Sequence, residues 1–322
     1  MRLATSAVLA ALAATAIASV PARATDWPTK PVTIYVTTAA GGNTDMMARM
    51  AADHLTATFG KTFVVENRPS AGGAQASGAV ASAAPDGYSI LFTPISAILL
   101  TPLVQKMSFN PDKTLTPVTN VGTGSQVIAV KRSLPINNLA EFLAYAKANP
   151  GKLNFAAAGT NNLSHLAPLL LFKRAEADVV MVPSRGEPQA ISDLIAGNVD
   201  FYFGNTSVLL AQRDNPAIRL LAVGTAERVP SAPDIPTASE TMPGFVFSSW
   251  NGFLVPNGTP EPIIEKLREA VSVLVKKPEV SARLTALGII PGGQTKEQVA
   301  AAFEADRRNI GEAVKAAGIP TP

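Results

Sequence analysis

The chain has 322 residues, with 27 lysines and arginines, 24 aspartates and glutamates, and no cysteine. The absence of cysteine excludes disulfide bonds and thiolate metal sites. Charges of both signs are interspersed and form no basic run, so nucleic acid is not an expected partner.

The first 24 residues have the pattern of an export signal. Arg2 gives a basic start, and residues 3–20 form an almost continuous apolar run. A small-x-small cleavage site follows at Ala22, Arg23 and Ala24. We therefore predict a signal peptide at 1–24 and an exported mature chain that begins near Thr25. An uncleaved membrane anchor is the alternative. Without Arg2 and Arg23 the formal net charge falls from +3 to about +1.

Short β-branched runs then alternate with helical patterns, which is typical of a mainly parallel sheet covered by helices. Residues 32–36, 63–65 and 88–92 are predicted strands. A helix is predicted from about Thr44 to Phe59, with Gly60 ending it. These elements form a β-loop-helix-β unit followed by a further strand.

A second set of elements begins near residue 127. Its predicted strands are 127–130, 153–156, 179–182, 199–203 and 218–223, and its predicted helices are 138–149, 164–173 and 188–196. Residues 225–243 are rich in Pro, Ser and Thr and are expected to be a long surface connection.

The C-terminal part returns to strand and helix. Residues 245–255 are a predicted strand, and a helix is predicted to start at Thr259-Pro260. Thr295 and Gln298 form a capping box for the last helix, which should stop at Gly318.

Two α/β sets and a returning segment predict an α/β fold of two lobes, joined by crossing strands near 121–130 and 247–255. Lobe 1 is expected to comprise 25–125 and 249–322, and lobe 2 to comprise 126–248. One continuous α/β domain is the alternative. Ligands of open α/β sheets bind at the carboxyl ends of the strands, so a ligand cleft is expected between the lobes.

A glycine-containing loop, Thr37 to Asp45, joins the first predicted strand to the first helix. The paired Gly41 and Gly42 let backbone N–H groups turn toward a ligand, and the helix N-terminus adds partial positive charge, so the loop favours an anion. A tight turn with a polar cap is the alternative. Asp45 is itself anionic and is expected to cap the helix.

A second loop of this kind follows the strand at 153–156 and runs from Ala158 to His165. It predicts a second anion-accepting helix start. Arg185 is the one cation that we expect near the cleft, and a solvated surface arginine is the alternative.

Catalytic patterns are absent from the sequence. His54 and His165 are the only histidines, and neither has acidic or histidine neighbours at metal-ligand spacing. The chain lacks a Gly-x-Ser-x-Gly elbow and a Walker loop. We therefore predict no catalytic activity, no metal and no cofactor, and a hydrolase using Ser164 and His165 is the weakest alternative.

The order of short motifs resembles the Bug-type solute receptors of tripartite tricarboxylate transporters. The motifs span essentially the whole mature chain: Trp27-Pro28, Gly41-Gly42-Asn43-Thr44-Asp45, Val65-Glu66-Asn67-Arg68-Pro69, Pro85-Asp86-Gly87-Tyr88, Ser164-His165-Leu166-Ala167, Val182-Pro183-x-Arg185-Gly186, Asp193-Leu194-x-Ala196-Gly197, Pro233-x-Ile235-Pro236-Thr237 and Trp250-x-Gly252.

This resemblance implies a periplasmic binding protein fold of the type II kind and a monomeric periplasmic receptor. Such a receptor closes on a small carboxylate and delivers it to membrane transporter subunits. We expect a mono- or dicarboxylate, with aromatic and amino acid carboxylates included. A receptor that presents its ligand to a sensor is the alternative. The residues that it implies as ligand contacts are Ala40, Gly41, Gly42, Asn43, Thr44, Ser96, Gly159, Thr160, Asn161, His165 and Asn205.

Two segments depart from the family pattern. Thr37-Thr38-Ala39-Ala40 stands where Pro-Phe-Ala-Pro is usual, which removes proline stiffening and adds hydroxyls, so Thr38 joins the candidate contacts. Ser184-Arg185 stands where Tyr-Lys is common. The identity of the ligand therefore does not follow from the family pattern.

Overall fold

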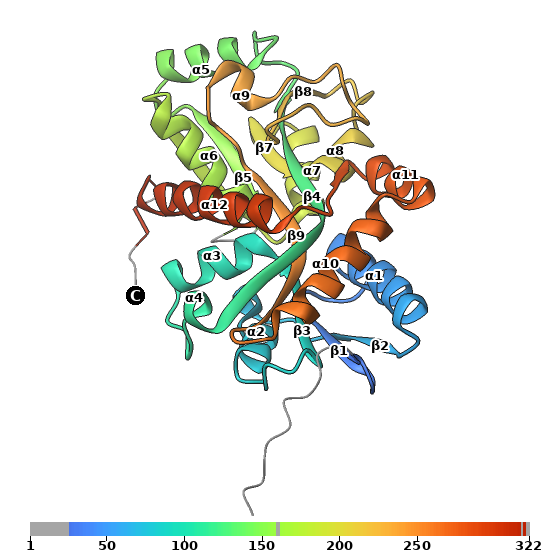
Figure 1. The fold of residues 1–322 in the computed structure, drawn as a ribbon. Coiled ribbons are helices and arrows are strands. Elements are labelled where there is room, and N and C mark those ends of the chain that lie inside the picture. Colours follow the sequence, from blue (N-terminus) through green and yellow to red (C-terminus); the bar gives the residue numbers. More distant parts are fainter. Residues whose placement is uncertain (1–25, 159–161, 317, 320–322) are drawn as a thin grey trace, which may run out of the picture.

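The computed structural model describes residues 26–158, 162–316 and 318–319 and has two lobes (Figure 1). The predicted signal peptide and the predicted contacts Gly159, Thr160 and Asn161 lie outside the described residues. In the part of the chain that is described, no helix is both long and apolar enough to cross a membrane.

Lobe 1 is built on a sheet in which β1 pairs in parallel with β2 and β3, as the alternating pattern predicted. The antiparallel strands β9, β4 and β10 extend it. Its strands are β1 (Val32–Val36), β2 (Phe63–Asn67), β3 (Ser89–Pro94), β9 (Ser248–Pro256), β10 (Ile289–Pro291) and the first part of β4 (Leu115–Lys131).

Lobe 2 is built on the end of β4, which pairs with β7 on one side and β8 on the other. The parallel strands β5 and β6 continue the sheet beyond β7. Its further strands are β5 (Leu153–Ala158), β6 (Val179–Ser184), β7 (Phe201–Asn205) and β8 (Ile218–Val223).

Helices cover both sheets. Lobe 1 carries η1 (Ala71–Gly73), α1 (Asn43–Phe59), α2 (Ala74–Ala81), α3 (Ile95–Val104), α4 (Pro111–Thr114), α10 (Glu261–Val275) and α11 (Pro278–Ala286). Lobe 2 carries α5 (Leu139–Ala148), α6 (Leu163–Arg174), α7 (Glu187–Ile195), α8 (Thr206–Leu210) and α9 (Ala238–Thr241). The last helix is α12 (Lys296–Ala316).

The helix ends follow their sequence signals closely. Gly60 has the left-handed conformation that ends α1, with φ of 66°. Thr295 and Gln298 make the predicted capping box at the start of α12. The start of α10 differs from its prediction, because the Thr259 hydroxyl donates to the Pro256 carbonyl oxygen instead of capping the helix.

The crossing strands pass between the lobes, and β4 begins several residues before the crossing strand predicted near 121–130 (Figure 1). Residues up to Ser125 pair with β9, and residues from Gln126 onward pair with β7. The part of β4 before residue 121 contains Pro117 and Asn120, which disfavour strands, but β9 supplies its hydrogen bonds. Tertiary pairing therefore overrides local preference.

The connection at 225–243 is only partly the surface segment that its composition predicted. Val229, Ala232 and Ile235 are buried in the core of lobe 2. Thr237 and Glu240 form a capping box that starts α9. Apolar side chains within a proline-rich segment can anchor it to a core while its backbone remains irregular.

Helix α12 lies across the boundary of the lobes, where it packs on α3 of lobe 1 and α6 of lobe 2 (Figure 1). Ile310, Ala313 and Val314 of this helix belong to one continuous apolar cluster that also contains side chains of both lobes. Asp306 of α12 accepts a hydrogen bond of 3.0 Å from Trp250 Nε1 on β9. Burial raises the pKa of the Asp306 carboxyl to about 6, although the Trp250 hydrogen bond opposes the rise.

We predict that Asp306→Asn stabilises the protein above pH 6. Between the ordinary pKa near 4 and the raised value, the folded protein holds a proton that the unfolded chain has released, so stability falls as pH rises through this window. The asparagine retains an acceptor for Trp250 and carries no charge. Chemical denaturation at pH 8 should show a gain of about 3 kcal/mol, and at pH 3.5 almost none.

Glu304→Gln, an exposed change on the same helix, is the control and should alter stability little at either pH. If the Asp306→Asn variant and the parent protein are equally stable at pH 8, the pKa of Asp306 is not raised in the folded protein.

Candidate functional site

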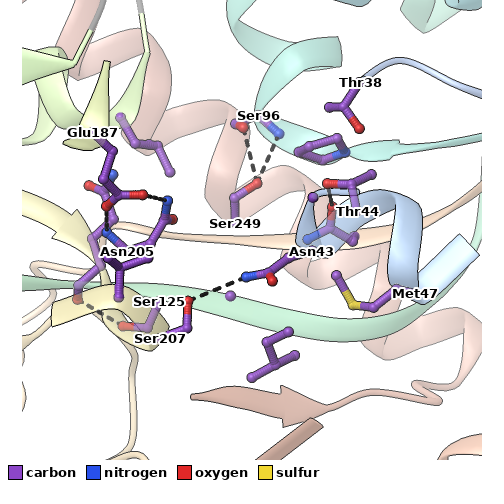
Figure 2. Close-up of a pocket in the computed structure, with 18 residues that line it drawn as sticks. Thr38, Asn43, Thr44, Met47, Ser96, Ser125, Glu187, Asn205, Ser207 and Ser249 are labelled. Atoms are coloured by element: carbon purple, nitrogen blue, oxygen red, sulfur yellow. Dashed lines mark hydrogen bonds between the residues drawn. The ribbon is translucent and has the colours of Figure 1, made fainter. Parts of the chain in front are cut away.

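A cleft of about 480 Å³ lies between the lobes (Figure 2). Lobe 1 contributes Thr38, Gly42, Asn43, Thr44, Met47, Pro94 and Ser96. Lobe 2 contributes Leu163, Glu187, Asn205, Ser207 and Val208. Strands β4, β9 and β10 contribute Gly124, Ser125, Gln126, Ser249, Asn251 and Ile289.

The cleft gathers the carboxyl ends of parallel strands from both lobes. The ends of β1 and β3 lead into α1 and α3, and the ends of β5, β6 and β7 lead into α6, α7 and α8. Helix N-termini and the polar residues before them therefore meet in one place, as expected for open α/β sheets. The first glycine loop and Leu163, at the end of the second loop, line the same cleft.

The predicted contacts divide into two described groups. Six of them line the cleft: Thr38, Gly42, Asn43, Thr44, Ser96 and Asn205. Four others are not among its lining residues: Ala40, Gly41, His165 and Arg185. Ala40, Gly41 and Arg185 are exposed, whereas His165 is buried in the first turn of α6, where burial lowers the pKa of its imidazole.

Asp45 fixes the first glycine loop. Its buried carboxylate accepts hydrogen bonds from the Gly41 N–H at 2.9 Å, from Arg49 Nε at 3.0 Å and from Asn67 Nδ2 at 2.9 Å. Burial raises the pKa of Asp45, but these three hydrogen bonds outweigh burial and hold the pKa below its usual value. The Gly41 amide is thus used within the loop, while Gly42, Asn43 and Thr44 face the cleft.

The lobe 1 side of the cleft presents hydrogen-bond donors. The Ser96 N–H donates to Ser249 Oγ at 3.3 Å, and the Ser249 hydroxyl donates to Ser96 Oγ at 3.0 Å, which leaves the Ser96 hydroxyl hydrogen for another acceptor (Figure 2). The Thr44 hydroxyl donates to Asn251 Oδ1 at 2.8 Å, so the Asn251 amide NH₂ remains a donor for another acceptor.

The lobe 2 side is organised around Glu187, the first residue of α7. Its carboxylate accepts the Asn205 N–H at 2.7 Å and Asn205 Nδ2 at 2.6 Å (Figure 2). It also accepts the Tyr202 hydroxyl at 3.3 Å. Burial, together with the Glu187 charge, raises the pKa of Tyr202, so that hydroxyl remains a donor at neutral pH.

One hydrogen bond joins the two lobes across the cleft. Asn43 Nδ2 of α1 donates to Ser207 Oγ of α8 at 3.4 Å (Figure 2). The distance is at the long end for a hydrogen bond, so the contact is weak. The two helix starts nevertheless lie close enough for a small ligand to touch both.

Several lining residues did not emerge from the sequence. Glu187 directly follows Gly186, and its place at a helix start after a strand is a usable signal. Gln126, Ser125 and Asn251 lie on crossing strands, and only the pairing of those strands brings them to the cleft. Among the described residues there is no group of histidine and acidic side chains that could hold a metal ion.

Residues 47–319 match the model of the family described as the tripartite tricarboxylate transporter family receptor. The chain belongs to this family. A relative, Protein BugT from Bordetella pertussis, is 32% identical over 299 residues, which are 91% of this chain and 90% of that protein.

Two solved structures are similar over nearly their whole length. Rpa4515 from R. palustris with adipate is 30% identical, with a TM-score of 0.75, and the match covers 91% of this chain and 99% of that one. MatC (Rpa3494) from Rhodopseudomonas palustris with bound malate is 32% identical, with a TM-score of 0.68, covering 90% and 99%. The Bug-type resemblance and the two-lobed α/β fold are therefore confirmed.

The family consists of solute-binding receptors, so the expectation of a binding protein that is not an enzyme is also confirmed. The cleft agrees with this conclusion. Its polar groups are hydroxyls, amides and one carboxylate, arranged to hold a small molecule by hydrogen bonds.

We predict that Asp45→Ala destabilises the receptor, because the Gly41 amide and the Arg49 and Asn67 side chains lose a buried anionic partner. The loss should be about 1 to 3 kcal/mol at pH 7. The pKa of Asp45 is depressed in the folded protein, so its contribution is present above pH 4 and is lost as pH falls through the folded value. Urea denaturation measures both quantities.

Asp53→Ala, an exposed change on the same helix, serves as the control. If Asp45→Ala and Asp53→Ala have the same stability at pH 7, the hydrogen bonds to Asp45 do not hold the loop.

Proposed function

We propose that this receptor is exported to the periplasm with removal of residues 1–24, captures a small carboxylate in the cleft and delivers it to the membrane subunits of a tripartite transporter. Its site contacts are Thr38, Gly42, Asn43, Thr44, Ser96 and Asn205, with Gly159, Thr160 and Asn161 completing them from the second loop. The receptor acts as a monomer.

The main support for this proposal is the set of hydrogen-bond donors on the lobe 1 side of the cleft. The start of α1 offers backbone N–H groups and partial positive charge to an anion. The Ser96 hydroxyl and the Asn251 amide add donors nearby, as their other hydrogen bonds dictate. Relatives with adipate and malate support a carboxylate as the chemical class.

The energetics are sufficient without a lysine or arginine. A micromolar dissociation constant requires about 8 kcal/mol. Hydrogen bonds to a charged group contribute ~1.5 to 3 kcal/mol each, and a helix terminus ~0.3 to 2 kcal/mol. Four such hydrogen bonds at the upper end of the range supply about 12 kcal/mol, and a cost of ~4 kcal/mol for immobilising the ligand leaves about 8 kcal/mol.

The proposal predicts a thermal shift with at least one member of a panel of mono-, di- and amino carboxylates. A ligand at 100 times its dissociation constant stabilises the folded state by about 2.7 kcal/mol, which corresponds to several degrees. Differential scanning fluorimetry measures the shift. If no carboxylate in the panel shifts the midpoint, the carboxylate proposal fails.

Gly42→Val should abolish this shift and leave the protein folded. Gly42 has an extended backbone with φ of −85°, which valine adopts, and a Cβ at this position would meet no atom within 4 Å. The branched side chain would instead fill space in the cleft, beside the start of α1. Isothermal titration should show at least a tenfold loss of affinity.

Ala40→Val is the matched control, since Ala40 is exposed in the same loop and does not line the cleft. Equal affinity of Gly42→Val and Ala40→Val would remove this loop from the site.

Delivery to a transporter is tested with vesicles that contain the membrane subunits. Uptake of the identified carboxylate should depend on added receptor and fall at least tenfold with Gly42→Val. Uptake that proceeds equally without receptor would refute delivery and leave ligand capture unaffected.

A further inference from the structure

The two sides of the cleft have opposite hydrogen-bonding character. The lobe 1 side offers donors, as described above. On the lobe 2 side, Glu187 is the one charged residue among the described residues that line the cleft. The segment 159–161 is Gly-Thr-Asn and adds no charge. The lining residues therefore place a negative charge in the site without a lysine or arginine to neutralise it.

Asn205 donates its hydrogen bonds to Glu187 and does not neutralise that charge for a ligand. Both its backbone N–H and its side-chain amide donate to Glu187, at 2.7 Å and 2.6 Å. The amide oxygen of Asn205 is then the part that remains for a ligand. This predicted ligand contact thus presents an acceptor to the cleft.

Gln126 adds an independent observation. It lies directly across the β4–β7 ladder from Asn205, lines the cleft and is only 9% exposed. Its buried Oε1 has no hydrogen-bond partner among the described residues. A buried acceptor without a donor is costly, and a ligand that supplies the donor recovers that cost.

Glu187 itself has capacity for one more donor. An ionised carboxylate has about four acceptor positions, and Asn205 and Tyr202 supply three donors. A second carboxylate at this end of the cleft would meet the Glu187 charge and the Gln126 oxygen, which both repel it. A group with several N–H donors and a positive charge would satisfy both.

We propose that the ligand is an amino carboxylate, with its carboxylate on the donors of lobe 1 and its ammonium group between Glu187 and Gln126. This assignment rests on the proposed function, because it presupposes carboxylate capture in the same cleft. It distinguishes this receptor's ligand from simple dicarboxylates, whose second anionic end has no favourable partner on the lobe 2 side.

Matched ligand sets test the proposal in the unmodified receptor. Each set contains four compounds of one chain length between three and six carbons. Three are straight-chain carboxylates that end in an ammonium, a carboxylate or a methyl group, and the fourth is the α-amino acid of that length. Isothermal titration at pH 7 should give an amino carboxylate at least ten times the affinity of the dicarboxylate and of the methyl-ended acid. A dicarboxylate or a methyl-ended acid that binds as tightly overturns the proposal.

Two variants locate the ammonium site. Glu187→Gln should reduce the preference for the amino carboxylate over the dicarboxylate at least tenfold, whereas Gln126→Glu should raise it. Should Glu187→Gln fail to fold because Asn205 and Tyr202 lose their partner, Gln126→Glu and the unmodified receptor still decide the question. An unchanged preference in a folded Glu187→Gln variant refutes the assignment.

Arg185 provides the remaining check. It is exposed and lies two residues before Glu187. Tight dicarboxylate binding that disappears in Arg185→Gln would show that this arginine neutralises the site, and would overturn the proposal. If no carboxylate of any kind binds, the proposed function itself fails, which is a different outcome from carboxylate binding without preference for an ammonium.

Discussion

The continuity of β4 is the constraint on which the architecture depends. This one strand pairs with β9 in the sheet of lobe 1 up to Ser125 and with β7 in the sheet of lobe 2 from Gln126. The change of partner occurs where Gly124, Ser125 and Gln126 line the cleft. The backbone that connects the lobes is therefore also the floor of the binding site.

The two acidic residues near the cleft are both held by hydrogen-bond donors, but they differ in position. The anionic Asp45 is paired with Gly41, Arg49 and Asn67 inside the first loop, where it holds the loop and does not face the ligand. Glu187 is paired with Asn205 and Tyr202 but borders the cleft. Two acidic residues near helix N-termini thus have different consequences: one fixes the shape of the site and the other determines its polarity. Neutral donors remain for the proposed carboxylate, which would need no buried cation.

Much of the fold could be predicted from the sequence because the relevant signals are local. The alternation of β-branched runs with helical spacing, Gly60 as a helix end and the Thr295 capping box each depend on neighbouring residues. The length of β4 and the burial of Ile235 depend on partners far along the chain. Site residues at strand-to-helix junctions could be predicted from the sequence pattern. Gln126 and Asn251 reach the cleft only through the pairing of crossing strands. The use of the Gly41 amide by Asp45 is a question of loop conformation, which composition does not define.

The position of α12 limits how the lobes can move. Exposed ion pairs tie the helix to each lobe, Arg307 with Asp112 and Arg174 with Glu312, and such pairs break and re-form at little cost. The apolar contacts of α12 with α3 and α6 are different, since a wide separation of the lobes would expose them to water. A separation of the lobes that keeps these contacts is therefore limited, and it has to break the hydrogen bond between Asn43 and Ser207. Ligand exchange would then require the loss of one long hydrogen bond, while α12 stays packed on α3 and α6.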